Sequence, residues 1–223
     1  MGVNCVISVP MEENKSGQYV ITKLQKKIEN LGAKKAGHFS VDCETYQSQI
    51  PIEGQVKVIN NVHDTEYPAS TFSFVENGPH LVADNTLDML FAKMDSFYAP
   101  KKNFKIEAKG VRYELNDFLI KVGSVIIGQN TSVKGILLQI DYTPCILYND
   151  SWGIITELLH ILGINPNITN FFKSRLEKKE SSVDYTDCAQ QYLELFNSVR
   201  KSMTVNQQPP GMSSSPVMIQ GRM

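Results

Sequence analysis

The stretch "ELNDFLIKVGSVIIG", residues 114–128, is apolar on both of the faces that an extended chain presents. A strand with one solvated side alternates apolar and polar residues, because successive side chains point to opposite faces. Here neither face is polar, and only Lys121, Gly123 and Ser124 interrupt the apolar run. We therefore expect a long strand that is covered on both sides, which raises the question of what covers the second face.

The rest of the chain contains many more runs that are typical of strands. They are short, rich in β-branched and aromatic residues, and separated by gaps with Gly, Asn, Asp or Pro, which favours antiparallel pairing between neighbours. These further runs lie at residues 38–46, 55–62, 70–78, 80–84, 104–110, 111–115, 134–142 and 145–149.

Apolar stripes at three- and four-residue steps predict four helices, each of which follows a residue that can cap a helix. The helices are expected after Ser16 as far as Gly32, from Leu87 to Phe97, after Ser151, and from Cys188 to Val199. Residues 165–182 are interpreted as a polar connection.

Together these elements predict a single α+β domain over residues 1–201. Its expected centre is an antiparallel β-barrel of about eight strands flanked by helices. Residues 202–223 contain several Pro, Gly and Ser residues and few charges, so we expect a disordered C-terminal tail.

The composition excludes several classes of function. Among 223 residues, 22 basic side chains balance 23 acidic ones, which leaves no strongly basic surface for direct nucleic-acid binding. No apolar run reaches the roughly 18 residues that a membrane span needs, and no secretory signal is recognisable. The four cysteines, at positions 5, 43, 145 and 188, are too scattered for a zinc site, and we expect reduced, mostly buried thiols.

The strongest candidate for catalysis is the pair Asp42 and Glu44, which would share one strand face and could hold a metal ion or share a proton. A solvated strand face accounts for the pair more simply, because Asp and Glu are rarely buried unless paired. Neither a nucleophile signature nor a glycine-rich phosphate loop is present, and His63 is interpreted as a turn residue. We expect no metal, no cofactor and no enzymatic activity, although distant strands can assemble a site without any signature.

Several stretches of the sequence resemble one known family in order and spacing. They are "MGVNC" at 1–5, "LGAKKAGHFSVDCETY" at 31–46, "TEYP" at 65–68, "FVENGP" at 74–79, "LVAD" at 81–84, "GVRYELNDFLIKVGSVIIG" at 110–128, "IDYTPC" at 140–145 and "YLELFNSVRK" at 192–201. The family is the TATA-binding-protein-related subunit of the transcriptional Mediator complex, its subunit twenty. The resemblance extends from residue 1 to about 201, apart from the connection at 163–182.

The resemblance implies a non-enzymatic subunit of the Mediator head module in the nucleus, which helps to transmit regulatory signals to RNA polymerase II. It also implies a barrel similar to that of Mediator subunit eighteen, with which the family forms a heterodimer, and a segment of subunit eight that ties the pair to the other head subunits. The predicted partner interface is Tyr113, Phe118, Ile120, Val122 and Ile126, chosen for apolar size within the most family-like stretch. The second face of the opening strand would then meet either a partner subunit or a helix of the same chain, such as the one ending at Gly32.

The family's barrel also resembles tunnel-type RNA triphosphatases, which supplies the alternative function, a metal-dependent RNA or polyphosphate phosphatase. That chemistry uses two Glu-x-Glu pairs on tunnel strands to hold a divalent metal against a triphosphate. This chain offers the single pair Asp42 and Glu44, while the three-residue spacing of Glu114 and Asp117 would send their side chains to opposite faces. We therefore expect no phosphatase activity.

Overall fold

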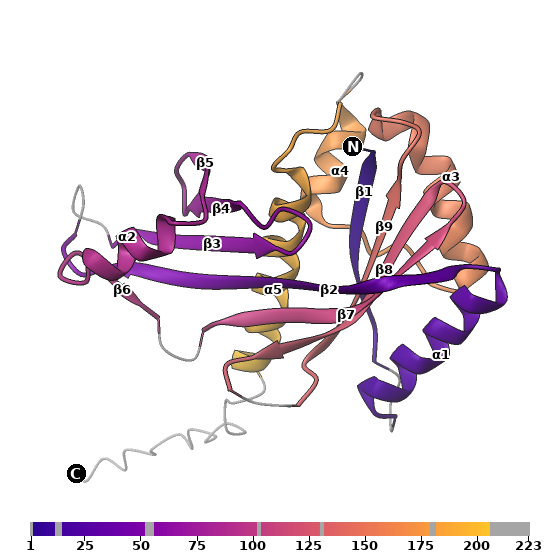
Figure 1. Ribbon diagram of the computed structural model, residues 1–223, viewed down its shortest axis with the longest axis horizontal. Helices are drawn as coiled ribbons and strands as arrows, with labels where there is room; N and C mark the ends of the chain where they lie inside the picture. Colours follow the sequence, from indigo (N-terminus) through magenta and orange to yellow (C-terminus); the bar gives the residue numbers. More distant parts are fainter. Residues whose placement is uncertain are drawn as a thin grey trace, which may run out of the picture.

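The computed structural model describes residues 2–11, 15–51, 56–101, 104–129, 132–178 and 182–205. Its nine strands form one antiparallel sheet in the order β1-β9-β8-β7-β2-β3-β4-β5, and the short β6 pairs with β2 (Figure 1). The strands are β1 (Val3–Val9), β2 (Lys34–Ser48), β3 (Val58–Asp64), β4 (Ser70–Val75), β5 (His80–Asp84), β6 (Tyr98–Pro100), β7 (Ile106–Leu115), β8 (Phe118–Ile127) and β9 (Gly135–Tyr142).

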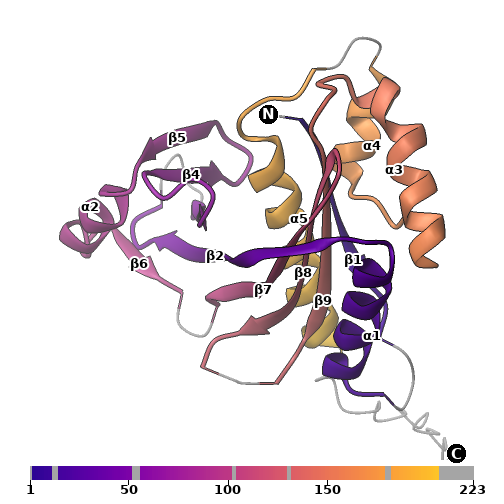
Figure 2. The ribbon, with the colours of Figure 1, turned by 45° about the vertical axis from the view of Figure 1, so that its right-hand side comes forward.

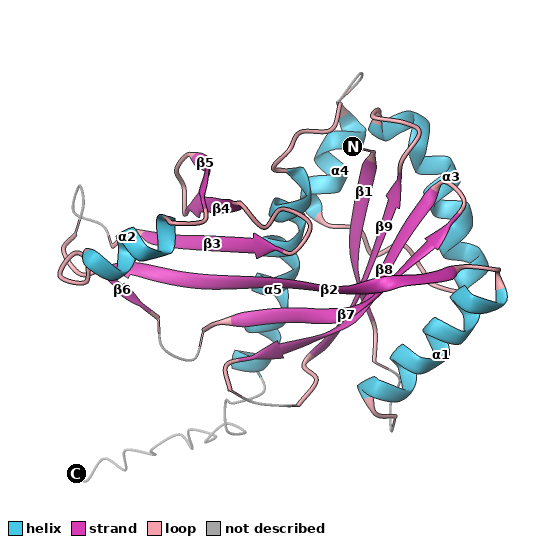
Figure 3. Cartoon of the chain, in the orientation of Figure 1, coloured by secondary structure: helices cyan, strands magenta, loops and turns pink. Residues whose placement is uncertain are grey.

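Five helices pack around this sheet (Figure 3). They are α1 (Gly17–Asn30), α2 (Leu87–Lys93), α3 (Tyr148–Leu162), α4 (Asn170–Glu177) and α5 (Asp187–Val205). Helices α1 and α3 lie on one face of the sheet, here called the α1 face, and α5 lies on the other, the α5 face (Figures 1 and 2). None of the described helices is long and apolar enough to cross a membrane. The predicted α+β class, an antiparallel barrel with flanking helices, is confirmed in the form of a half-barrel.

The long strand β2 joins two parts of the molecule. Its first part pairs with β7 as far as Cys43, and its second part pairs with β3 from Val41 onward and with β6 at its end. Strands β3 to β6, helix α2 and the end of β2 therefore project from the rest of the chain as an arm, seen on the left of Figure 1. The remaining elements form the body.

Two large apolar clusters answer the question raised by residues 114–128. On the α1 face, Ile120 and Val122 of β8 belong to the same cluster as Leu24 of α1. On the α5 face, Val125 belongs to a cluster with Phe196 of α5. The chain's own helices thus cover both faces of β8. This agrees with the second of the two alternatives considered above, a helix of the same chain that ends at Gly32. A third, small cluster lies in the arm.

The segment expected to be a polar connection contains the helix α4, so this prediction is wrong. The hydroxyl of Thr169 accepts a hydrogen bond from the backbone N–H of Phe172 at 3.2 Å, which caps the helix. The ring of Phe172 is fully buried, and its centroid lies 5.1 Å from that of Tyr148. One buried anchor in a helix of two turns is too little periodicity to be recognised in the sequence.

Three other element predictions need correction. Residues 145–149 are not a strand, because α3 begins at Tyr148 and only Leu147 forms an isolated bridge. The runs 104–110 and 111–115 are one strand, β7, in which Gly110 pairs with Gly123 of β8 without interruption. The helix expected to reach Phe97 ends at Lys93 and is followed by β6.

The division into a domain over residues 1–201 and a tail stays a prediction. Helix α5 continues to Val205, beyond the boundary placed after residue 201. Residues 206–223, which make up most of the predicted disordered tail, lie outside the described residues. The prediction for those residues therefore stays a prediction.

Candidate interaction surface

The five residues of the predicted partner interface are not equally accessible. Tyr113 is 2% exposed, and Ile120 and Val122 are 0% exposed, because all three lie in the core cluster of the α1 face. Phe118 and Ile126 are half-buried. A second protein could reach the last two while the chain's own helices stay in place, but it could not reach the first three. That these residues form an interface stays a prediction.

The candidate catalytic carboxylates Asp42 and Glu44 share one face of β2, as expected, but each is already paired with a cation. The Nδ1 atom of His63 lies 3.5 Å from a carboxylate oxygen of Asp42, and its Nε2 atom lies 2.7 Å from one of Asp88. The Nζ atom of Lys105 lies 2.6 Å from a carboxylate oxygen of Glu44. Hydrogen bonds to Asp42 and Asp88 raise the pKa of His63 to about 10, so its imidazole is charged at neutral pH.

The interpretation of His63 as a turn residue is wrong. It lies in β3, directly opposite Asp42 of β2 in the register of the sheet. The strand predicted at residues 55–62 extends two residues further, to Asp64, and so includes His63. Hydrogen bonds to Thr45 and Asp88 hold the side chains of Asn60 and Asn61 in this strand. The carboxylates belong to an ion-pair network on the arm. Among the described residues, no three His, Cys, Asp or Glu side chains are arranged to hold a metal ion.

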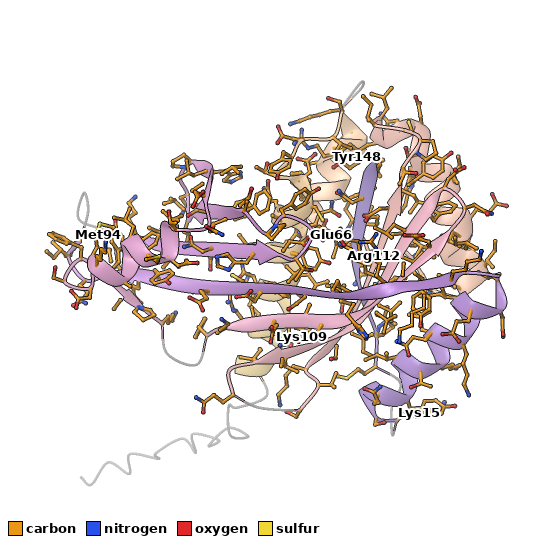
Figure 4. The ribbon with its side chains drawn as sticks, viewed as in Figure 1. Lys15, Glu66, Met94, Lys109, Arg112 and Tyr148 are labelled. Atoms are coloured by element: carbon orange, nitrogen blue, oxygen red, sulfur yellow. The ribbon has the colours of Figure 1, made fainter. Side chains whose placement is uncertain are left out.

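A second set of charges, which the sequence did not single out, lies on the α5 face. The ammonium group of Lys121, on a side chain only 1% exposed, is 3.4 Å from a carboxylate oxygen of Glu66. One guanidinium nitrogen of Arg112 lies 3.1 and 3.2 Å from the two oxygens of Glu66, and Figure 4 shows these two residues together near the centre of the molecule. Burial raises the pKa of Asp141 to about 6, although Lys121 opposes the shift.

These charges do not form a phosphate-binding site. A pocket of about 200 Å³ is lined by Asp64, Glu66 and Asp141 but by only one cation, Lys121. A triphosphate would meet more negative than positive charge there, which is unfavourable in a partly buried site. Glu114 and Asp117 do not add to this site, since Asp117 lies in the turn between β7 and β8.

Helix α5 packs against the concave face of the half-barrel. It contacts both β1 and β3, which lie on opposite sides of the strand order, so the sheet curves around it (Figure 2). The buried side chains of Tyr192, Phe196 and Val199 pack against the sheet's apolar residues on this face. The inside of the half-barrel is therefore a packed core.

The arm carries half of the exposed large apolar side chains of the described residues. Seven of the fourteen exposed large apolar side chains lie between residues 50 and 97, although this segment is less than a quarter of the chain. We call them the arm surface: Ile50, Val56, Leu81, Val82, Met89, Leu90 and Phe97. Ile50 and Phe97 line one pocket, and an apolar surface shared by several exposed side chains marks sites of contact between proteins more often than a lone exposed Leu or Ile does.

Two further features suit the arm to binding another protein. Ile50, Met94, Phe97 and Tyr98 line an apolar pocket of about 370 Å³, and Met94 lies near the tip of the arm in Figure 4. Strand β5 ends the sheet, and both of its faces are exposed at Leu81 and Val82. The sequence does not reveal this surface, because the apolar stripe near α2 predicts a core position for each of its residues. The small arm cluster cannot bury them all.

The fold and surface define a helix-flanked half-barrel protein suited to contacts with other proteins. A family model described as "TATA-binding related factor (TRF) of subunit 20 of Mediator complex" matches residues 1–197. The chain belongs to this family.

The chain is similar along nearly its whole length to proteins named "Mediator of RNA polymerase II transcription subunit 20". It is 42% identical to the protein from Gallus gallus, covering 92% of this chain and 97% of that one, and 38% identical to the protein from Drosophila melanogaster, covering 97% and 92%. A chain of the Mediator head module of Schizosaccharomyces pombe is 12% identical, with a TM-score of 0.37 over 74% of this chain and 96% of that one. A TM-score this low carries no weight.

Proposed function

We propose that this protein is a non-catalytic subunit of the Mediator coactivator complex, acting in the nucleus within the head module. The shared name of its relatives and the nearly full-length match support this assignment. In that role the protein pairs with Mediator subunit eighteen, is linked to the other head subunits through subunit eight, and affects RNA polymerase II only indirectly.

The exposed apolar side chains of the arm are the observation that supports a binding role best. Met89 is 62% exposed and Phe97 is 55% exposed, and neither would remain in water if a partner covered the arm. Burying a fully exposed side chain of this size is favourable by about 1.5 to 3 kcal/mol. These two side chains, which are already partly covered, would gain part of that. We therefore propose that the arm surface carries the main contact with subunit eighteen, and that Phe118 and Ile126 of the interface predicted from the sequence contribute at its margin or not at all.

The three buried members of that predicted interface have a different role in this proposal. Tyr113, Ile120 and Val122 hold α1 and β8 together, and the Tyr113 hydroxyl donates a hydrogen bond to Glu29 of α1 at 3.0 Å. Replacing them would weaken partner binding only by unfolding the body. This distinguishes them from residues that touch the partner.

The proposal is tested by co-expressing the chain with subunit eighteen and washing the captured pair at rising salt. We expect the arm variant Met89→Glu/Phe97→Glu to lose subunit eighteen, because two buried charges would be unpaired in the contact. The matched control is Ile154→Glu/Ile161→Glu on α3, where the side chains are 40% and 58% exposed, and it should retain the partner.

Two outcomes would contradict the proposal. Loss of subunit eighteen from the α3 variant but not from the arm variant would move the contact to the body. Capture of the wild-type chain from nuclear extract without any Mediator head subunit would overturn the Mediator assignment itself.

The lack of catalysis is a separate part of the proposal. The paired state of Asp42 and Glu44 and the packing of α5 inside the half-barrel support it. Purified protein supplied with Mn²⁺ and triphosphate-ended RNA should release no phosphate above the level of a heat-denatured sample. Sustained release that disappears in Asp42→Asn would contradict this.

A further inference from the structure

A groove on the α1 face has a chemistry different from that of the arm. It has a volume of about 420 Å³ and lies between α1, the C-terminal end of α3 and the end of β1. Its floor consists of nearly buried aliphatic side chains: Val9, Val20, Leu24, Leu162 and Ile164. We call it the α1–α3 groove. Its size is in the range of pockets that accept a small ligand or a few side chains of a peptide.

The rim of the groove is positively charged. Lys23 and Lys27 stand one turn apart on α1, and the described residues that line the groove include no Asp or Glu. Across from them, the exposed residues Asn165 and Asn167 supply amide groups. An apolar floor between an ammonium rim and an amide rim is complementary to a chain that carries both apolar and acidic side chains.

Lys27 makes one hydrogen bond within the protein, and its ammonium group has further N–H donors. Its Nζ atom donates a hydrogen bond to the backbone carbonyl of Leu162 at 2.6 Å, where the end of α3 leaves carbonyl groups without helical partners. An ammonium group has three donors, so further hydrogen bonds to an incoming carboxylate are possible. Lys23 also has an interaction within the chain, which such a carboxylate would share.

We propose that the α1–α3 groove binds an acidic, amphipathic peptide segment of a partner protein. An apolar side chain of the peptide lies on the floor between Leu24 and Ile164, and its flanking carboxylates bind Lys23 and Lys27. The groove lies in the body, on the α1 face, whereas the arm surface lies beyond the end of β2. This contact is therefore additional to the one proposed for subunit eighteen.

Other occupants fit the groove less well. A basic peptide would face two lysines with no carboxylate among the described lining residues, so it would be repelled. A neutral apolar peptide would gain nothing from the attraction of Lys23 and Lys27 for negative charge. A nucleic-acid strand needs a longer basic track, with aromatic side chains on which bases stack, and the described lining contains no aromatic residue.

The experiment uses the full chain and a fluorescein-labelled synthetic peptide in which Asp and Glu alternate with Leu and Phe, followed by fluorescence anisotropy. We expect Lys23→Glu to weaken binding about tenfold, because it replaces an attraction with a repulsion at the rim. Lys26→Glu is the matched control, since Lys26 is an exposed lysine of the same helix that does not line the groove. It should bind the peptide within about twofold of the wild type.

A second variant tests the floor without changing charge. Asn167→Trp places a large ring over the groove and should weaken binding by at least tenfold, whereas Asn30→Trp, at the exposed end of α1 and away from the lining residues, should not. Thermal melts of all four variants establish that they fold. The arm variant Met89→Glu/Phe97→Glu should bind the peptide normally, which separates this inference from the proposed arm contact.

Three results would overturn the inference. The first is an equal loss of binding in Lys23→Glu and Lys26→Glu, which would mean nonspecific attraction to a basic helix. The second is equally tight binding of a peptide with Gln and Asn in place of Glu and Asp, or of a fatty acid that competes for the floor. The third is no binding of the acidic peptide to the wild-type chain at low salt, where charge attraction is strongest.

Discussion

At the scale of single residues, buried polar side chains join elements that are far apart in the sequence. Asp187 at the start of α5 is 0% exposed, and its carboxylate accepts hydrogen bonds from the Tyr148 hydroxyl of α3 at 2.8 Å and from Arg175 of α4 at 2.5 Å. We predict that Asp187→Asn lowers the free energy of unfolding by about 3 to 5 kcal/mol in urea titrations, because it leaves the buried Arg175 contact uncompensated. The exposed Asp150→Asn should change it by less than about 0.5 kcal/mol; equal losses would contradict this role.

His63 gives the arm a stability that depends on pH. Its folded-state pKa of about 10 lies above the ordinary value of 6.5, so its contribution is complete below about pH 6.5 and is lost as the pH rises towards about 10. We predict that His63→Gln destabilises the protein by about 1 to 2 kcal/mol near pH 6 and by clearly less near pH 10. Urea unfolding at both pH values measures the difference, and the exposed His160→Gln is the control. A difference that grows with pH would contradict the assignment of a charged His63.

At the scale of secondary-structure elements, the two edge strands of the sheet, β1 and β5, differ in how much of each is covered by the rest of the chain. The side-chain amide of Gln191 on α5 accepts a hydrogen bond from the backbone N–H of Val6 at 3.0 Å and donates one to the carbonyl of Asn4 at 2.9 Å. It therefore pairs with the open edge of β1 much as another strand would. Strand β5, at the other end, has both faces exposed. This contrast supports the arm as the side from which a partner approaches.

We predict that Gln191→Leu lowers the free energy of unfolding by about 2 to 4 kcal/mol, since two buried backbone groups of β1 lose their partners. Hydrogen exchange at the amide of Val6 should accelerate more than exchange in β8. Gln190→Leu, on the next position of α5 and only half-buried, is the matched control and should have little effect. Similar losses in the two variants would mean that α5 tolerates no leucine on that side, rather than that Gln191 protects the edge.

The sequence predicted the elements that have strong periodicity and missed those fixed by single tertiary contacts. The helix after Ser16 was recognised from its cap and stripe, and the Ser16 hydroxyl indeed accepts a hydrogen bond from Tyr19. Helix α4 depends on the Thr169 cap, on the burial of Phe172 and on Glu194 of α5. The Glu194 carboxylate accepts hydrogen bonds from the first backbone N–H groups of α4, a contact that no local pattern reveals. The pairing of Asp42 with His63 joins two strands, and that of Glu66 with Arg112 joins the turn after β3 to β7. Such pairs depend on strand register, which a single sequence does not specify.

At the scale of the whole molecule, the buried apolar side chains are unevenly distributed between the body and the arm. The body contains the cluster of the α1 face and most of the cluster of the α5 face, which extends into the arm through Val62, Phe72 and Phe74. The separate arm cluster has three buried members, Tyr46, Ile59 and Phe91. The rings of Tyr46 and Phe91 stack with centroids 4.6 Å apart. Regions with few buried apolar contacts open at lower free energies than the rest of a protein. The arm should therefore open locally while the body stays folded, and a partner that covers the arm surface would suppress this opening.

Two phenylalanines of similar burial allow a direct test of this division. Phe196→Ala removes a fully buried ring from the body and should lower the global free energy of unfolding by about 3 to 5 kcal/mol. Phe91→Ala removes a ring that is 6% exposed from the arm. It should speed hydrogen exchange most in α2 and β6, whose residues pack in the same cluster, while lowering the global value by less than Phe196→Ala does. If Phe91→Ala instead accelerated exchange in β7, β8 and β9 to the same extent, the arm and body would unfold as one cooperative unit. The long shared strand β2 would then transmit the loss from one part to the other.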